Sequence, residues 1–211
     1  MRNIAFCVMA LMLACANTVF ANKKDEASSE SAPLPKVLVV APDNNVNSDY
    51  YVPEMLTEGT GIGKDSISYT YNNVIAAALQ KAASKEKIVV VNGCSKLPAS
   101  IAKGIRLSGD GENATVDLSM VNKGQLGQEM RQLGASYLLV IDQHFLKYQE
   151  VPFRTMFHFV NYSVYDSNER KLGQGKSYFT SFEPQSAKDM AKSSQKSSKK
   201  MVEDISKMIN M

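Results

Sequence analysis

One carboxylate and two imidazoles, those of Asp142, His144 and His158, are the side chains best suited to hold a metal ion. Asp142 and His144 are two residues apart in an apolar segment, so strand alternation would place them on one face. His158 falls in the next predicted strand, and in-register pairing would bring all three together as a two-histidine, one-acid site. The alternative is the polar outer face of an antiparallel sheet, and this is what we expect, with no metal or other cofactor.

The same three residues, or Cys94 with one histidine, are the candidate machinery of a hydrolase. No Gly-x-Ser-x-Gly nucleophile turn accompanies them in the sequence. Cys94 follows Gly93 at the end of a predicted strand, where nucleophiles are often displayed. A thiolate at neutral pH needs a histidine partner, however, and neither histidine is near in sequence. We therefore expect an inert thiol and place a metal-dependent or thiol hydrolase behind the non-enzymatic readings.

Glycines at 59, 61 and 63 followed by Lys64 suggest a phosphate-binding loop ahead of a helix. Such a loop needs a glycine five places before its final glycine and a hydroxyl after the lysine. These two places hold Glu58 and Asp65, both acidic and both unsuited to a phosphate and its metal. The pattern therefore predicts a flexible loop at a helix start, where Lys64 retains at most a weak capacity to bind an anion.

The elements that would position these residues follow from hydrophobic periodicity. Continuous apolar runs at 37–41 and 88–91 are typical of strands covered on both faces, and a helix with one apolar face separates them. The sequence predicts an α/β or α+β fold with a single mixed sheet of about five strands, helices packed on it, and the order β-α-β-α-β-β-β-α. Two antiparallel strands near 153–165 and 171–182 are joined by a polar turn, and a closing helix covers about 186–209.

The amino-terminal 21 residues have the three parts of a secretory signal peptide. Arg2 gives a positive start, 4–14 is apolar, and Val19 and Ala21 are small residues suited to cleavage after Ala21. The competing interpretation takes Cys15 as the acylated first residue of a lipoprotein. An apolar run of this length is too short to cross a bilayer, which requires about 20 residues.

The rest of the chain divides into a tether and one domain. Residues 22–35 are charged, Ser-rich and Pro-ended, which predicts a flexible linker, and 36–211 are long enough for a single α/β domain with its own core. Removal of the signal peptide lowers the net charge from +3 to +2, because Arg2 is its only charged residue. A charge this near zero argues against nucleic acid as a partner, and against a membrane except through a lipid anchor at Cys15.

A family resemblance appears in the second half of the chain. The run 133–140 reads LGASYLLV, a later strand ends in Tyr165-Asp166, and a small-residue strand starts with KLGQG at 171–175. This pattern resembles bacterial envelope proteins: the amino-terminal domain of the Tol translocation protein, the curli-secretion lipoprotein and the penicillin-binding-protein-activator lipoproteins. The resemblance implies an envelope adaptor without catalytic residues.

Aromatic residues are concentrated in the long loop and helix start between Pro42 and Tyr71. Loops of about 20 residues in compact domains tend to be functional, so we expect this region to contact a partner or ligand. The binding candidates are Tyr50, Tyr51, Met55, Lys64, Tyr69 and Tyr71. The alternative is that these aromatics fold back over the core.

Together these features predict an exported, non-enzymatic binding or adaptor protein of the cell envelope, periplasmic, secreted or lipid-anchored. The expected partner is another envelope protein or a cell-wall component. A small-ligand carrier, with an apolar cavity between sheet and helices, is the alternative from another functional class.

The first prediction concerns the mature amino terminus. Small residues at the −3 and −1 positions fit the peptidase groove, so intact-mass spectrometry of protein purified from its native host is expected to show a chain that begins at Asn22. A mass corresponding to a diacylated Cys15 would contradict this and establish a lipoprotein.

Overall fold

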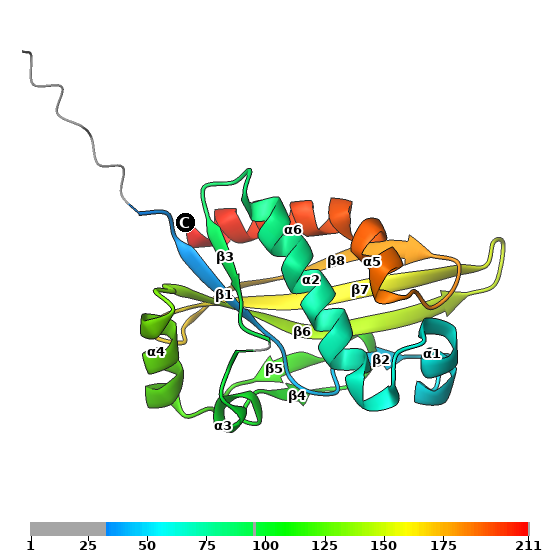
Figure 1. The fold of residues 1–211 in the computed structure, drawn as a ribbon, viewed down its shortest axis with the longest axis horizontal. Helices are drawn as coiled ribbons and strands as arrows, with labels where there is room; N and C mark the ends of the chain where they lie inside the picture. The colour runs from blue at the N-terminus through cyan, green and yellow to red at the C-terminus, as the bar shows by residue number, and fades with distance from the viewer. Residues whose placement is uncertain (1–32, 95, 211) are drawn as a thin grey trace, which may run out of the picture. The chain divides into compact units, whose positions relative to one another are not determined.

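The computed structural model describes residues 33–94 and 96–210, which form a main mixed sheet with helices packed on it and a small second sheet (Figure 1). This confirms the predicted fold class. The strands are β1 (Lys36–Val40), β2 (Val46–Ser48), β3 (Val89–Asn92), β4 (Arg106–Ser108), β5 (Thr115–Asp117), β6 (Tyr137–Gln149), β7 (Thr155–Asp166) and β8 (Lys171–Ser181). The helices are α1 (Pro53–Thr60), α2 (Ile67–Ala83), α3 (Ala99–Ala102), α4 (Lys123–Gln132), α5 (Ala187–Ser193) and α6 (Gln195–Ile209), with short 3-10 helices η1 (Lys64–Ser66) and η2 (Gly111–Asn113).

The main sheet has the order β3-β1-β6-β7-β8, and β2 also pairs with β6. Strand β1 is parallel to both of its neighbours, as expected for strands connected through helices, while β6, β7 and β8 form an antiparallel meander. Because β6 has 13 residues, it pairs with β1 near its start and with β2 near its end. The second sheet is the small hairpin β4–β5.

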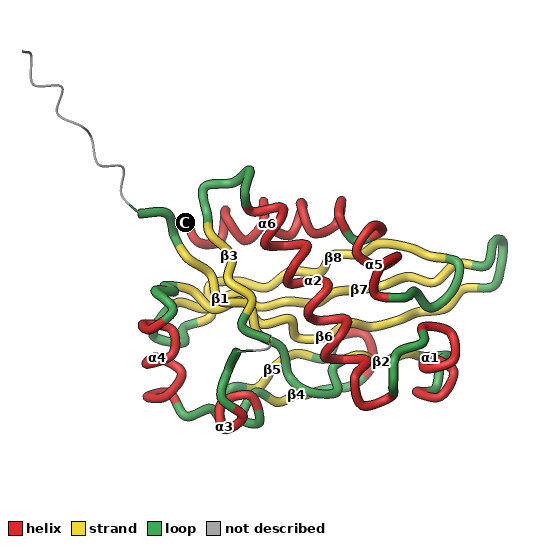
Figure 2. The backbone as a smooth tube through the Cα atoms, viewed as in Figure 1, coloured by secondary structure: helices red, strands yellow, loops and turns green. Residues whose placement is uncertain are grey.

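One face of the main sheet is covered by α2, α5 and α6 (Figure 2). Helix α2 presents Tyr71, Ile75 and Leu79 at spacings of four residues, and all three are fully buried. Helix α6 buries Met201 and Ile205 in the same core. Hydrophobic periodicity therefore places these helices against the strands.

The opposite face is covered only in part. Leu126 and Met130 of α4 and Ile101 of α3 pack against Leu138 and Val140, near the start of β6. Further along β6, β7 and β8, aromatic side chains remain at the surface, and Tyr178 is 61% exposed. Only the end of the sheet that carries β1 and β3 therefore has helices on both faces.

Several elements are missing from the sequence-based prediction. The expected loop at 42–65 contains β2 and α1; this short helix begins at Pro53 and ends at Gly61, whose positive φ of 70° closes it. The closing helix is divided at Ser194, which ends α5 and begins α6. The main meander and its polar turn are as predicted, and Asp166 accepts hydrogen bonds from the backbone N–H groups of Asn168 and Arg170.

The second prediction concerns Gly175 of β8, which lies opposite Tyr162. A Cβ atom at Gly175 would overlap the buried ring of Tyr162, whereas a Cβ at Gly173 would meet only the flexible thioether of Met208, with Sδ at 2.8 Å. We expect Gly175→Ala to lower the free energy of unfolding by about 1–3 kcal/mol, as overpacking does.

Gly173→Ala is the matched control on the same strand, and urea denaturation followed by circular dichroism measures both variants. We expect the control to stay within about 1 kcal/mol of the wild type, because Met208 can move and alanine loses less entropy than glycine on folding. Equal losses in the two variants would contradict this packing.

Candidate functional site

Three chain segments place exposed apolar side chains at one end of the main sheet, where α1, the β6–β7 turn and the end of β8 lie (Figure 1). We call this surface the aromatic end. Its exposed apolar residues are Tyr50, Val52, Met55, Val151, Phe153 and Phe182. The exposed fractions of Phe153 and Phe182 are 77% and 80%. Large apolar side chains gathered at a surface in this way are characteristic of interaction sites.

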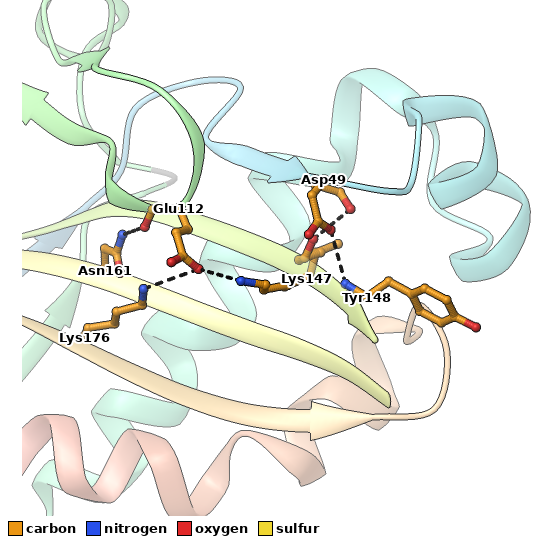
Figure 3. A network of polar contacts seen from close by, with 8 residues as sticks. Asp49, Glu112, Lys147, Tyr148, Asn161 and Lys176 are labelled. Carbon is orange, nitrogen blue, oxygen red and sulfur yellow. Dashed lines mark hydrogen bonds and ion pairs between the residues drawn. The ribbon is translucent and has the colours of Figure 1, made fainter. Parts of the chain in front are cut away.

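The first of these segments is fixed to the sheet by backbone-directed hydrogen bonds. The Ser48 hydroxyl donates to the Leu146 carbonyl at 2.8 Å and accepts from the N–H groups of Tyr50 and Tyr51 at 3.1 and 3.0 Å. Asp49 accepts from the Tyr148 N–H at 3.2 Å (Figure 3). The backbone that carries Tyr50 and Tyr51 is therefore attached to the end of β6.

An aromatic cluster forms where this segment meets β6. The rings of Tyr50 and Tyr148 stack with centroids 4.5 Å apart, and Tyr51 contacts both rings edge-on. Arg154 donates from Nε to the Tyr148 hydroxyl at 3.1 Å. Burial, followed by the charges of the neighbouring tyrosines, raises the pKa of Tyr51, so its hydroxyl stays protonated at neutral pH. The cluster offers ring faces and hydroxyl groups but no nucleophile.

A recess of about 590 Å³ opens beside the cluster. Gly59 allows close packing at its wall, because an added Cβ would lie 3.2 Å from Pro184. The recess is lined by Tyr51, Met55, Glu58, Gly59, Arg154, Phe182, Glu183 and Pro184. Aromatic, methionine and arginine side chains together are the composition enriched at the centres of protein interfaces.

A larger recess, of about 1100 Å³, lies between α2 and the pair α5 and α6. Its exposed side chains are mainly alanines and lysines, among them Lys81, Lys192 and Lys196. Lysines on the outer faces of amphipathic helices are normally solvated, so size alone does not make this recess the better candidate.

The structure brings three of the six predicted binding residues to the aromatic end: Tyr50, Tyr51 and Met55. Lys64 instead forms an exposed ion pair with Glu54 at 2.9 Å. Tyr69 is exposed on α2, beside the larger recess. Tyr69 therefore lies on a different surface, whereas Lys64 lies next to α1 with its charge already paired.

Tyr71 requires a correction, because it is a core residue and not a surface one. It is fully buried beneath α5, and its hydroxyl donates to the Gln185 carbonyl at 3.1 Å. Desolvation raises its pKa to about 12. Tyr71 lies four residues before Ile75 and so belongs to the buried stripe of α2.

Sequence reasoning missed the other half of the surface, contributed by Val151, Phe153, Arg154 and Phe182. The available signal was the presence of large apolar residues in the turns that end β6 and β8, where polar residues are usual. Because these residues are far from Tyr50 in the sequence, their proximity to it in the fold could not be predicted.

The two histidines do meet, on the sheet face beneath α2. His144 Nε2 lies 3.1 Å from His158 Nδ1, and His158 Nε2 lies 2.9 Å from the Ser181 hydroxyl. Since Ser181 donates its proton to the Glu183 carbonyl at 2.7 Å, His158 must donate to Ser181 from Nε2 and accept at Nδ1. His144 then donates from Nε2, and its Nδ1 has no partner among the described residues.

Both rings are fully buried, and this determines their charge. Desolvation lowers the pKa of His158 to about 3, and desolvation together with the neighbouring His158 lowers the pKa of His144 well below 6.5. Both imidazoles are therefore neutral at pH 7.

Asp142 does not join the histidines, so the expected shared face is wrong. A β-bulge between Ile141 and Gln143 makes Asp142 an extra residue in the pairing with β7, which reverses the alternation. Its carboxylate accepts from the Ser163 hydroxyl at 2.6 Å on the opposite face of the sheet. Over residues 33–94 and 96–210, no three His, Cys, Asp or Glu side chains are grouped to hold a metal ion.

The remaining candidates for chemistry are separate from one another. Cys94 is partly buried, desolvation raises its pKa to about 12, and its thiol lies 3.8 Å from the Val39 carbonyl. The glycines of the suspected phosphate loop end α1 and precede η1, so they do not connect a strand to a helix. Neither feature provides an activated nucleophile or a phosphate cradle.

The predicted signal peptide, Cys15 and most of the 22–35 linker lie outside the described residues. Within the part that the structure describes, no helix has the length and apolar character needed to cross a membrane.

The third prediction follows from the buried histidines. As the pH falls below 6.5, the unfolded chain binds protons that the folded histidines cannot, so the free energy of unfolding falls between pH 6.5 and about 3. Each histidine contributes a slope of up to about 1.4 kcal/mol per pH unit. Asp142 opposes this effect, because its pKa is raised to about 6 and its stabilising contribution is lost as the pH rises through that value.

Urea denaturation across pH 4–7 measures this balance. We expect the free energy of unfolding to change less steeply with pH in the His144→Gln/His158→Gln double variant and more steeply in Asp142→Asn. The double variant loses the contribution of the histidines, and Asp142→Asn loses the contribution that opposes it. A wild-type slope unchanged by the double substitution would show that the histidines are not buried in neutral form.

Comparison with known proteins gives distant structural alignments and no family. A scan of protein-family models and a search of curated proteins each found no match. Solved structures that align with the chain include a PelC dodecamer from Paraburkholderia phytofirmans, at 10% identity over 81% of this chain and 88% of that chain, with a TM-score of 0.38.

Two further structures align similarly. Hypothetical protein CT253 from Chlamydia trachomatis is 12% identical over 83% of this chain and 98% of that chain, with a TM-score of 0.47. Lipoprotein GNA1162 from Neisseria meningitidis is 15% identical over 70% of this chain and 83% of that chain, with a TM-score of 0.33. TM-scores below 0.5 support no conclusion about function, and the resemblance to the Tol, curli-secretion and penicillin-binding-protein-activator proteins stays a prediction.

Proposed function

We propose that this chain is an exported, non-enzymatic binding protein of the cell envelope, and that its aromatic end binds another envelope protein. The observation that carries the proposal is that three separate segments meet at one recess, to which they contribute the exposed apolar side chains of Met55 and Phe182 and the side chain of Arg154. The signal-peptide pattern of the first 21 residues supports export.

The energetics favour a partner with apolar or aromatic anchors. Full burial of a phenylalanine side chain contributes about 1.5–3 kcal/mol, and Phe153 and Phe182 leave most of this unused in the free protein. Glu58, Arg154 and Glu183 line the same recess and can pair with polar groups around such an anchor. A protein surface supplies both kinds of group, whereas a polysaccharide of the cell wall supplies few apolar anchors.

Preorganisation also supports a binding role. The Ser48 hydroxyl fixes the backbone of Tyr50 and Tyr51, and ring contacts with Tyr148 order their side chains before any partner arrives. Binding then costs little ordering of these side chains, and such ordering otherwise costs about 0.5–1.5 kcal/mol for each.

The fourth prediction tests this function by photo-crosslinking in the native host. A photoreactive phenylalanine at Phe182, Phe153 or Met55 is expected to give the same discrete adduct with one envelope protein, because the three positions share a surface. Met120 is 62% exposed outside this surface and is the matched control. Mass spectrometry of the adduct identifies the partner.

The identified partner is then purified and its affinity is measured. We expect Phe182→Ala to weaken binding at least tenfold, and Met120→Ala to change it less than twofold. An adduct that forms equally at position 120, an adduct with a second copy of this chain, or unchanged affinity of Phe182→Ala would overturn the proposal.

A further inference from the structure

The larger recess lies between α2 and the pair α5 and α6, on the helical layer that covers the main sheet (Figure 2). Helix α2 turns its buried stripe of Tyr71, Ile75 and Leu79 toward the sheet, and the residues that line the recess follow another stripe of the same helix. The volume of about 1100 Å³ is roughly twice that of the recess at the aromatic end. The helices therefore leave a groove that no other element of the described chain occupies.

Small apolar side chains form the floor of the recess. Val74, Ala78 and Ala82 recur every four residues along α2 and are half-buried. Val74 and Ala82 also pack against the main core, which fixes their positions. Packed helices have their axes about 8–10 Å apart, and the shorter distances need small side chains at the contact. The floor is thus suited to the close approach of another helix.

Lysines form the rim of the recess. They are all exposed, and they are Lys81, Lys85, Lys192, Lys196 and Lys199. Among residues 33–94 and 96–210, no Asp or Glu lines the recess, and of these lysines only Lys199 forms an ion pair, with Glu203 at 3.6 Å. The rim therefore concentrates more positive charge than the net charge of the whole chain, which is +3.

The single sign of charge distinguishes this recess from an ordinary solvated helix face. Exposed faces usually mix basic and acidic residues, as α6 does where Lys207 lies 3.3 Å from Asp204. A cleft lined by one sign of charge focuses its field and attracts ligands of the opposite sign. The recess therefore complements a ligand that carries several negative charges.

The shape and the apolar residues favour a helix of a partner protein over an anionic membrane. Helices that bind a bilayer surface carry Trp, Phe or Leu on their apolar face. Here the apolar residues between the lysines are mainly alanines, and the large exposed ring of Tyr69 lies near the start of α2. A groove between two helices also suits a cylinder better than it suits a flat bilayer.

We propose that the larger recess binds an acidic amphipathic helix of a partner protein. The apolar stripe of that helix packs on Val74, Ala78 and Ala82, and its carboxylates lie beside Lys81 and Lys196. This is the helix-in-groove mode, in which apolar anchors recur at three- and four-residue spacings. The two recesses are lined by different residues, so this proposal does not rest on the function proposed for the aromatic end.

The fifth prediction tests the recess with a defined peptide. The acidic probe consists of three repeats of the heptad Glu-Leu-Ala-Glu-Leu-Leu-Glu and carries fluorescein. The control peptide has the same composition in an order without a helical apolar stripe. Fluorescence anisotropy follows the titration of each peptide with the mature protein. We expect saturable binding of the acidic helix, at least tenfold tighter than that of the control peptide.

Charge-reversal variants locate the binding site. Lys81→Glu/Lys196→Glu is expected to weaken binding of the acidic helix at least tenfold, because it places carboxylates at the rim. Lys96→Glu/Lys103→Glu makes the same change of net charge at exposed positions outside the recess, and it should change the affinity less than threefold. Circular dichroism verifies that both variants are folded.

A third variant tests the apolar part of the recess. Ala77 is exposed in the lining, so Ala77→Gln fills space there without disturbing the core and keeps a good helix former. We expect it to weaken binding of the acidic helix at least fivefold.

Several outcomes would overturn the proposal: no saturable binding of the acidic helix, equally tight binding of the control peptide, or equal losses in the two double variants. Vesicles of phosphatidylglycerol provide the remaining arm. Protein that binds these vesicles through Lys81 and Lys196 but does not bind the acidic helix would assign the recess to a membrane surface and overturn the proposal as well.

Discussion

The bulge in β6 is the constraint on which the arrangement of the described domain depends. At this point the strand changes neighbours, pairing with β1 before the bulge and with β2 after it. The buried side chain of Asn45 bridges the change: it donates to the Ile141 carbonyl at 3.0 Å and exchanges hydrogen bonds with Asn72 of α2. The Asn45 carbonyl accepts from the His144 N–H at 3.0 Å, so the irregular stretch stays paired.

The bulge places His144 and Asp142 on opposite faces of β6, in two different environments. Beyond it, His144 is directed under α2, where burial keeps both histidines neutral, and Asp142 is directed to the opposite face, where it borders a pocket. An acid and a base held on opposite faces of a sheet cannot share a proton or a metal ion. Tyr148, the second-last residue of the same strand, stacks on Tyr50 of the aromatic end. The arrangement is therefore better suited to presenting fixed surfaces than to acid–base chemistry.

The sequence predicted what depends on hydrophobic periodicity. The strand β1 covered on both faces, the buried stripe of α2 and the antiparallel meander with its turn at Asp166 all follow from residue patterns, and the structure confirms them. The second strand predicted to be covered, β3, leaves Val89 38% exposed. Half of the aromatic end was also predictable, because Tyr50, Tyr51 and Met55 are close together in sequence.

The features that the sequence did not reveal depend on contacts between distant residues. A bulge leaves no mark in an apolar run, so simple alternation puts Asp142 and His144 on one face, which they do not share. Phe153 and Phe182 join Tyr50 only through the pairing of β6, β7 and β8. By contrast, the prediction groups Tyr71 with its exposed neighbour Tyr69, although its spacing of four residues from Ile75 places it in the buried stripe of α2.

Hydrogen–deuterium exchange of the mature protein, free and with a fraction of envelope proteins from its host, tests the central claim most directly. Binding through the aromatic end predicts added protection at 50–55, 150–154 and 182–184 together, since the partner would cover all three segments at once. Protection confined to α2 and α6, or no change in these three segments while the protein is bound, would contradict it.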